Sequence, residues 1–329
     1  MSMQKILVLD VPADSGGALT VLKEYYERLK QDGDNRYLFC LGVAELPPTD
    51  TVRVLRFPWV KRSWLHRLWF DQITVKRLIR REKPDRILSL QNVTVPGAPC
   101  PQTLYLHQSL PFCGIRFSLW RQPKFWVYQH LISRRIIRSV RRADRVILQT
   151  KWMRDAVCQK AGISPDKVTL ETPEVGAVTA QFDKSAWRRG FFYPASPLVY
   201  KNHERILQAM ERLADRGIRD YEVTFTLTAD QLPCLSRYPR AAERLRLPGQ
   251  MPREQVMETY ASTVLLFPSY IETFGLPLLE ARQTGAPVLA SDCPFSREIL
   301  EGYASARFFD PFSPDELADR MSEILEEGL

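Results

Sequence analysis

Two spacings of apolar residues alternate along the chain and predict its secondary structure. Short apolar runs, such as residues 6–9 and 264–267, have the length and composition of buried strands. Longer stretches, such as residues 19–31, repeat apolar residues every three or four positions, which indicates helices with one buried side. Strands that alternate with helices predict an α/β protein whose parallel sheets are covered by helices on both faces.

The same pattern divides the chain into two domains. Residues 1–172 and 190–329 each contain a series of strands and helices, whereas residues 173–189 show no periodicity and are predicted to link the two. A length of 329 residues is ample for two domains. The predicted strands are residues 5–10, 36–41, 51–57, 86–90, 103–106, 146–150, 168–170, 190–194, 222–227, 264–267, 287–290 and 307–309, and the predicted helices are residues 19–31, 64–82, 124–142, 152–160, 204–216, 253–261, 276–284 and 314–327.

Composition agrees with an ordinary globular protein. Hydrophobic residues make up 45% of the chain and charged residues 26%. No apolar run is long enough to span a membrane, and the run 6–9 stops at Asp10, so we expect a first strand there and no secretory signal. The six cysteines and four histidines are scattered without metal-ligand spacing, which favours a cytoplasmic protein with no metal site.

Charge is distributed unevenly between the two halves. Residues 1–172 contain 29 Lys and Arg against 15 Asp and Glu, a net of +14, whereas the remaining residues contain 17 against 23, a net of −6. This asymmetry suggests that the first domain meets an anionic partner.

Residues 112–145 concentrate that positive charge. They combine nine basic residues and one acid with six aromatic residues. Apolar residues recur at helical spacing from residue 124 to 142, a pattern that suits either an anionic membrane surface or an ordinary helix with a core-facing side. The aromatic residues ahead of this helix favour the membrane, and no nucleic-acid motif accompanies the charge, so we expect no nucleic-acid partner.

Candidate chemistry lies at a predicted strand-to-helix junction. Glu272 lies on the loop after strand 264–267, and Glu280 lies inside the helix that follows. Pro277 fits the first turn of that helix, whose free N–H groups and positive dipole end suit a phosphate. A carboxylate nearby can accept hydrogen bonds from ribose hydroxyls. Either Glu alone is typical of a solvated surface residue, but in this context the two indicate a nucleotide-sugar site.

The run 268–280, with Ala281, residues 285–288 and Ser291-Asp292 behind it, resembles the donor-site signature of the family 4 glycosyltransferases. The likeness covers residues 264–299 closely and the rest of the chain more loosely. It implies the GT-B architecture, in which two Rossmann-like domains face each other across a cleft, with the acceptor on the first and the donor on the second. It also implies metal-independent, retaining transfer from a nucleotide-diphosphate sugar of UDP or GDP type, with no permanently bound cofactor.

The resemblance assigns roles in the second domain. It implies that Glu272 orients the donor sugar and that Glu280 holds the ribose. The residues implied to contact the donor besides these are Gly249, Phe274, Gly275 and Leu276. Lys201, followed by Asn202, matches the family's diphosphate-binding Lys-Asn element. Residues 193–197 lack the arginine that usually precedes it, so Lys201 acts alone or with Arg188 or Arg189.

Two candidates lie in the first domain. Gly17 follows the first strand, where family members have a glycine-rich loop that faces the diphosphate. His107 follows strand 103–106 and falls at the edge of the sheet where ligands bind. Family members often carry a histidine there, near the reacting sugar.

These features predict a transferase that moves a sugar to a hydroxyl of a glycan or lipid-linked acceptor. We expect it to act in bacterial surface polysaccharide or glycoconjugate synthesis, at the cytoplasmic face of the membrane. A nucleotide-sugar epimerase of the same architecture stays open. So does a non-catalytic nucleotide or anionic-surface binding protein, because the expected arginine is missing.

Overall fold

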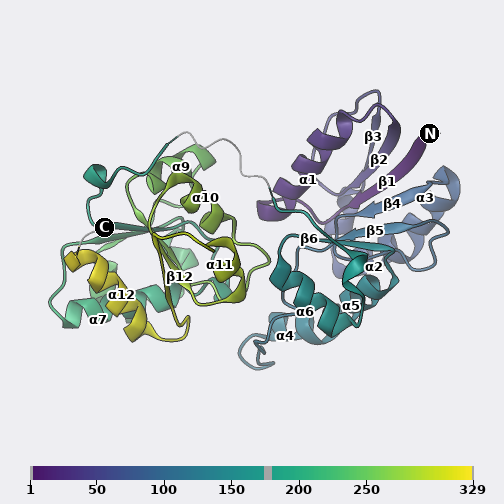
Figure 1. Cartoon of the computed structure of the whole chain (residues 1–329). Coiled ribbons are helices and arrows are strands. Elements are labelled where there is room, and N and C mark those ends of the chain that lie inside the picture. The colour runs from purple at the N-terminus through teal and green to yellow at the C-terminus, as the bar shows by residue number, and fades with distance from the viewer. Residues whose placement is uncertain (1–2, 174–179, 328–329) are drawn as a thin grey trace. The chain divides into compact units, whose positions relative to one another are not determined.

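The computed structural model describes residues 3–173 and 180–327. The chain divides into two compact units, residues 1–173 and 174–329. Among the described residues, each unit contains one parallel sheet with helices on both faces (Figure 1), which confirms the predicted fold class. Residues 174–179 of the predicted linker lie outside the described residues, so the bounds of that linker stay a prediction.

The first unit is built on a seven-stranded sheet in the order β3-β2-β1-β4-β5-β6-β7, in which all neighbouring strands pair in parallel. Its strands are β1 (Gln4–Asp10), β2 (Asn35–Leu41), β3 (Val52–Arg56), β4 (Arg86–Ser89), β5 (Gln102–Tyr105), β6 (Arg145–Leu148) and β7 (Val168–Leu170). Its helices are α1 (Gly16–Lys30), α2 (Trp64–Trp69), α3 (Val75–Glu82), α4 (Pro123–Val127), α5 (Ser133–Arg142) and α6 (Lys151–Ala161).

Alternation along β1 decides which helices cover which face of this sheet. Leu7 and Leu9 lie in one buried cluster with Leu78 of α3. Val8 lies in another cluster, with Leu22 of α1. Successive strand residues point to opposite faces of a sheet, so this one apolar strand contributes to two cores.

Two helical arms of the first unit contain a π-helical turn. The turn Phe70–Thr74 joins α2 to α3, and the turn Tyr128–Ile132 joins α4 to α5. The predicted helices 64–82 and 124–142 are confirmed, but their π-helical turns were not predicted. A π-helical turn closes i→i+5 hydrogen bonds, so it adds only about one residue to a single turn and leaves no clear trace in the sequence. Such turns are rare, and they frequently lie at functional sites.

The basic, aromatic segment 112–145 divides between the core and the surface. Phe112, Ile136 and Val140 are buried in one cluster with residues of α6. The core-facing alternative therefore holds for that side of α5. Trp120 and Leu131, by contrast, are 91% and 56% exposed, so a different set of apolar side chains remains open to solvent.

The second unit is built on a six-stranded parallel sheet in the order β10-β9-β8-β11-β12-β13. Its strands are β8 (Gly190–Tyr193), β9 (Glu222–Phe225), β10 (Leu245–Arg246), β11 (Val264–Phe267), β12 (Val288–Ser291) and β13 (Ala306–Phe309). Its helices are α7 (His203–Asp215), α8 (Pro239–Ala242), α9 (Arg253–Tyr260), α10 (Leu276–Thr284), α11 (Pro294–Ile299) and α12 (Pro314–Glu327).

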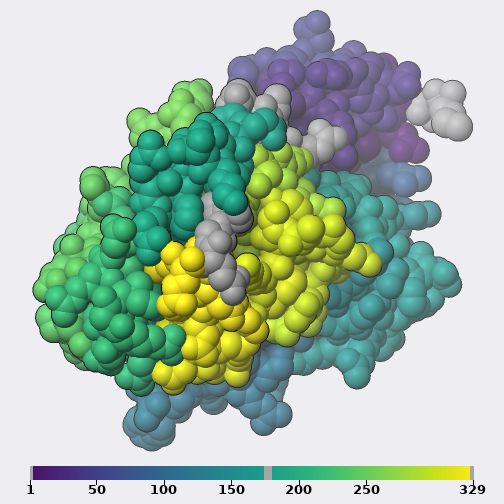
Figure 2. Space-filling view, turned by 60° about the vertical axis from the view of Figure 1, so that its left-hand side comes forward, coloured from purple at the N-terminus to yellow at the C-terminus, as the bar shows by residue number. Residues whose placement is uncertain are grey.

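Helices cover both faces of the second sheet. Helices α9 and α10 lie on one face and α7 and α12 on the other (Figure 1). The C-terminal helix α12, in yellow, lies at the surface beside α7, in green (Figure 2). The sequence predicts β11 and α10 with the observed bounds, whereas β10, α8 and α11 are too short to show a period and are missed.

Both sheets have a switch point where the strand order reverses. In the first sheet β1 lies between β2 and β4, and in the second β8 lies between β9 and β11. Ligands of open parallel sheets bind beyond the carboxyl ends of the strands that flank such a point. The segments after β1 and β4, and those after β8 and β11, are therefore the expected binding regions of the two units.

Residues 3–173 and 180–327 contain neither a candidate membrane span nor a cluster of metal-binding side chains. None of the helices there is long and apolar enough to cross a membrane. That part of the chain also contains no group of three or more His, Cys, Asp or Glu placed to hold a metal ion. The six cysteines are free.

Candidate active site

Lys201 and Glu272 meet at the switch point of the second sheet. Lys201 lies on the segment after β8, and Glu272 lies on the loop after β11. Lys201 Nζ forms a hydrogen-bonded ion pair with Glu272 Oε1, and the two side chains are 17% and 12% exposed. Ser269 Oγ donates a hydrogen bond to the same oxygen at 2.7 Å. The parallel topology thus joins two groups that the sequence separates by 71 residues.

Hydrogen bonds between the two segments hold this pair in place. Asn202 adopts a left-handed backbone conformation, and its Nδ2 donates to the carbonyl oxygens of Pro268 at 3.1 Å and Pro311 at 2.7 Å. The Tyr270 backbone N–H donates to the Tyr200 carbonyl at 3.1 Å. The segment after β8 is therefore fixed directly to the loop after β11.

The loop that carries Glu272 leads into α10. Gly275 caps this helix with a φ of +95°, a left-handed conformation that favours glycine. A Cβ at this position would lie 3.2 Å from the Leu278 side chain. Phe274 is buried and packs within the unit. Leu276 opens the first turn of α10, where backbone N–H groups lack intrahelical acceptors and the helix dipole is positive.

Glu280 is buried on α10, and both of its carboxyl oxygens have partners. Oε1 pairs with Arg253 Nη1 at 2.8 Å, and Oε2 accepts from the Tyr260 hydroxyl at 3.3 Å. Burial raises the pKa of the Glu280 carboxyl above its usual range, while the charge of Arg253 opposes that shift. A carboxylate has about four acceptor positions, so these contacts leave room for further donors such as ribose hydroxyls.

The partners of Glu280 were missed by the sequence analysis. Arg253 and Tyr260 are the two ends of α9, and they reach Glu280 because α9 packs against α10. The sequence shows that both residues belong to one helix. It does not show that this helix packs against α10.

Gly249 forms the turn between β10 and α9. Its φ is +80°, and its N–H donates to the Leu227 carbonyl at 3.0 Å. A Cβ would lie 3.4 Å from the Thr228 side chain. The backbone conformation alone therefore favours glycine here, and contact with a nucleobase stays a prediction.

Gly17 lies in a helix of the first unit and not in the predicted loop. Helix α1 begins at Gly16, three residues before the predicted start at residue 19, and Ser15 is its N-cap residue. A Cβ on Gly17 would meet no atom within 4 Å. Packing within the described structure therefore does not require glycine at this position.

His107 follows β5, as predicted, and is held by one side chain. Its backbone N–H donates to Asn92 Oδ1 at 2.9 Å, and its Nε2 lies 3.1 Å from Asn92 Nδ2. The amide nitrogen therefore donates to Nε2, and the ring proton of neutral His107 lies on Nδ1. Nδ1 is buried without a partner among the described residues. Burial lowers the pKa of His107 to about 4, so the ring is an uncharged donor at neutral pH.

The prediction that Arg188 or Arg189 binds the diphosphate together with Lys201 is wrong. Both arginines precede β8 and lie at its amino end, whereas Lys201 follows its carboxyl end. Arg189 is engaged there, since its guanidinium donates to the Leu325 carbonyl at 2.7 Å. A strand of four residues separates these arginines from the site.

The two-unit fold is that of the GT-B glycosyltransferases. The structure of Anabaena Alr3699/HepE in complex with UDP and glucose superimposes with a TM-score of 0.68 at 17% identity, covering 98% of this chain and 90% of that chain. The structure of WaaG, a glycosyltransferase involved in lipopolysaccharide biosynthesis, gives a TM-score of 0.65 at 13% identity, with the same coverage.

Family models match both units. The model for "Glycosyltransferase Family 4" matches residues 15–170, and that for "Glycosyl transferases group 1" matches residues 188–328. The chain belongs to the family 4 glycosyltransferases.

Curated relatives match only in part. The serotype-specific mannosyltransferase WbdA of Escherichia coli is 33% identical over 132 residues, which is 38% of this chain and 16% of that protein. The D-inositol 3-phosphate glycosyltransferase of Corynebacterium diphtheriae is 25% identical over 210 residues, which is 56% of this chain and 48% of that protein. The chain thus spans less than half the length of either relative.

Proposed function

We propose that this protein transfers a sugar from a nucleotide-diphosphate sugar to a hydroxyl of a glycan or lipid-linked acceptor. The observation that carries the proposal is the Lys201–Glu272 pair at the switch point of the second sheet, where the Glu272 loop leads into α10. An ammonium group and a helix N-terminus together suit a diphosphate. A carboxylate held beside them suits the hydroxyls of a sugar.

The side chains of the second unit divide the work. Lys201 and the first turn of α10 stabilise the charge that develops on the departing diphosphate, which is electrostatic catalysis by preorganised groups. Glu272 orients the hydroxyls of the donor sugar. Glu280, positioned by Arg253, accepts from the ribose. Other donor contacts are assigned to Gly249, Phe274, Gly275 and Leu276.

The first unit is proposed to contribute two groups to the same reaction. His107 offers the proton on Nδ1 to a hydroxyl of the reacting sugar, which its uncharged state allows at neutral pH. Gly17 lets the backbone of α1 approach the diphosphate, since nothing else fills the space that a Cβ would occupy.

The mechanism and the donor class follow the family resemblance. Transfer is proposed to retain the anomeric configuration and to need no metal ion, with a UDP- or GDP-sugar as donor. The complex of Alr3699/HepE with UDP and glucose supports a uridine nucleotide. The serotype-specific relative and WaaG support a role in bacterial surface polysaccharide or glycoconjugate synthesis, at the cytoplasmic face of the membrane.

Calorimetric titration with UDP, GDP, ADP and dTDP tests this proposal. We expect UDP or GDP to bind the full chain and Glu280→Gln to weaken that binding by about tenfold or more, because the amide replaces an acceptor oxygen with a donor. The variant keeps the size of the side chain, which protects the packing around Tyr260. Glu258→Gln, an exposed change on α9, is the matched control and should bind like the wild type. Failure of all four nucleotides to bind the wild type would overturn the proposal.

A further inference from the structure

A cavity lies at the switch point of the first sheet. Its volume is about 750 Å³, within the usual range for ligand sites. Pro12, from the segment after β1, lines it together with Gln91 and Asn92, from the segment after β4. The first unit therefore has a cavity at the position in its sheet where the second unit carries the Lys201–Glu272 pair.

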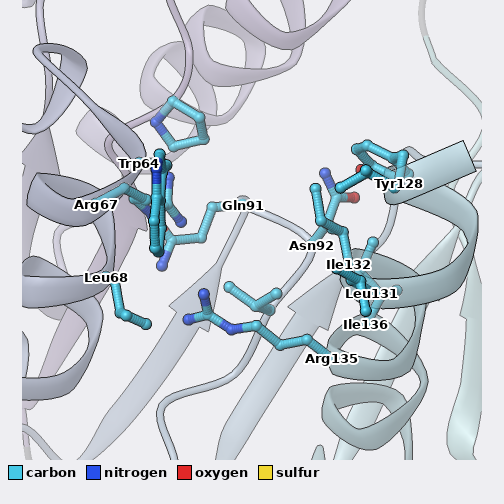
Figure 3. A pocket seen from close by; sticks show the side chains of 13 residues that line it. Trp64, Arg67, Leu68, Gln91, Asn92, Tyr128, Leu131, Ile132, Arg135 and Ile136 are labelled. Carbon is cyan, nitrogen blue, oxygen red and sulfur yellow. The ribbon is translucent and has the colours of Figure 1, made fainter. Parts of the chain in front are cut away.

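Two helical arms supply apolar walls to this cavity (Figure 3). Trp64 and Leu68 come from α2, on one side. The other side is lined by Val127, Tyr128, Leu131, Ile132 and Ile136, which belong to α4, its π-helical turn and α5. The wall is mostly hydrocarbon, so water molecules in the cavity would find few hydrogen-bond partners on it.

The rim of the cavity is also apolar and is open to solvent. Trp64 is 74% exposed and Ile132 is 41% exposed. A more open apolar pocket is formed by residues close to Trp64 in the sequence. It is lined by Trp59, Leu65, His66 and Trp69. Exposed apolar surface of this kind on a soluble unit is typical of a binding site for an apolar group.

The cavity wall carries an excess positive charge. Asp71, in the π-helical turn after α2, accepts from Arg67 Nε at 3.0 Å and from Arg135 at 2.6 Å. Two guanidinium groups therefore share one buried carboxylate, and both line the cavity. Lys61 and Asp14 form a separate ion pair at 2.6 Å, so these two residues add no net charge. The wall thus offers one net positive charge in a poorly solvated place, which favours an anion.

Asp10 does not cancel this charge at neutral pH. Its carboxyl ends β1, and Arg67 is the largest charge that acts on it. Burial nevertheless raises its pKa to about 8. The carboxyl group is then mostly protonated at pH 7, and the excess charge of the two arginines remains.

We propose that this cavity binds a lipid phosphate, with the hydrocarbon chain along the apolar walls and the phosphate on Arg67 and Arg135. An apolar chain and one anionic group are the two chemistries that the walls complement. The inference rests on the proposed function, because it identifies the lipid-linked acceptor as the substrate class. The π-helical turn after α4 lines the cavity with Leu131. The π-helical turn after α2 supplies Asp71, which holds the two arginines that line it, as expected where such turns serve a site.

Titration of the full chain with three probes tests the cavity. The probes are farnesyl phosphate, farnesol and inorganic phosphate, each kept below any micelle-forming concentration, with tryptophan fluorescence as the readout because Trp64 lines the cavity. We expect farnesyl phosphate to bind about tenfold or more tightly than farnesol and inorganic phosphate to give no change. Equal affinity for farnesyl phosphate and farnesol would overturn the proposal.

Variants assign the binding to named side chains. Arg135→Gln should weaken the binding of farnesyl phosphate by about tenfold or more and leave the binding of farnesol unchanged. Arg142→Gln, an exposed change on the same helix, should alter neither. Ile132→Ser, at a rim position whose exposure protects folding, should weaken both lipids. The same loss in Arg142→Gln as in Arg135→Gln, or unchanged binding in Ile132→Ser, would overturn the assignment.

Nucleotide titration of the same variants separates this inference from the proposed function. We expect Arg135→Gln and Ile132→Ser to bind the nucleoside diphosphate like the wild type, because that site belongs to the second unit. Nucleotide binding without lipid-phosphate binding would overturn the cavity assignment alone. Lipid-phosphate binding without any nucleotide binding would support the cavity and overturn the proposed function.

Discussion

Asp10 is an ionisable residue in a fully buried position. It ends β1 with 0% of its surface exposed, and no side chain among the described residues donates a hydrogen bond to its carboxyl oxygens. Burial raises its pKa from the ordinary 3.8 to about 8, while the charge of Arg67 opposes the shift. The folded protein therefore keeps a proton that the unfolded chain has lost at neutral pH.

This shift predicts how stability depends on pH. Between about pH 4 and pH 8 the folded state binds the extra proton, so the contribution of Asp10 to the free energy of unfolding falls as the pH rises and levels off above pH 8. Asp10→Asn cannot ionise, so its stability relative to the wild type should increase over the same range. Each unit of raised pKa corresponds to about 1.4 kcal/mol, so we expect a gain of more than about 2 kcal/mol from pH 4.5 to pH 8.

Urea denaturation at a series of pH values measures this difference. Asp50→Asn, an exposed change in the same unit, is the control and should follow the wild type at every pH. A constant difference between Asp10→Asn and the wild type from pH 4.5 to pH 8 would contradict the assigned protonation of Asp10.

At the scale of elements, the two helical arms of the first unit form a surface that is both apolar and basic. They expose large apolar side chains, among them Trp64, Trp69 and Leu131, and the loop ahead of α4 exposes Trp120. Basic side chains lie among these, and Arg134 and Arg138 of α5 are exposed. Apolar and basic groups together suit an anionic lipid surface, where each basic residue contributes about 1 kcal/mol.

Co-sedimentation with vesicles tests the arms as a membrane surface. We expect binding to vesicles with anionic lipid, weaker binding at higher salt, and loss of binding when Arg134 and Arg138 are both changed to Glu. Arg135 is left intact, because Asp71 holds it in the cavity wall. Changing Lys184 and Arg219, two exposed cations of the second unit, to Glu is the control and should have a smaller effect. Equal binding to neutral and anionic vesicles, or none at low salt, would contradict this role.

The sequence predicts most elements because their spacing carries the information. Strand β11 is four buried residues followed by a loop, and α10 starts where Pro277 fits and ends at Gly285. Both were predicted with their observed bounds. The π-helical turns were not, because the helical period continues through them almost unchanged.

The sequence names residues of the candidate site but does not give their contacts. Motif and position marked Lys201, Glu272 and Glu280, whereas their partners depend on tertiary packing. Glu280 meets Arg253 only because α9 packs on α10. The cavity of the first unit was missed for the same reason, since its walls come from two arms that the sequence separates widely.

At the scale of the whole molecule, the two units differ in net charge and in the ligand proposed for each. The first 172 residues carry a net charge of +14 and the rest −6. The basic unit contains the cavity proposed for a lipid phosphate, and the other contains the pair proposed for the diphosphate. Transfer would use both ligands in one reaction, which neither an epimerase nor a binding protein would do.

Release of nucleoside diphosphate from a nucleotide sugar, with and without an acceptor glycan linked to a lipid phosphate, tests this claim most directly. Lys201→Met removes the cation but leaves Glu272 without its partner, which costs stability. The double variant Lys201→Met with Glu272→Gln removes both charges and should recover stability. We predict acceptor-dependent release by the wild type and release slower by about 10²-fold in both variants. Wild-type turnover in the double variant, or isomerised donor with no nucleotide released by the wild type, would contradict glycosyl transfer at this site.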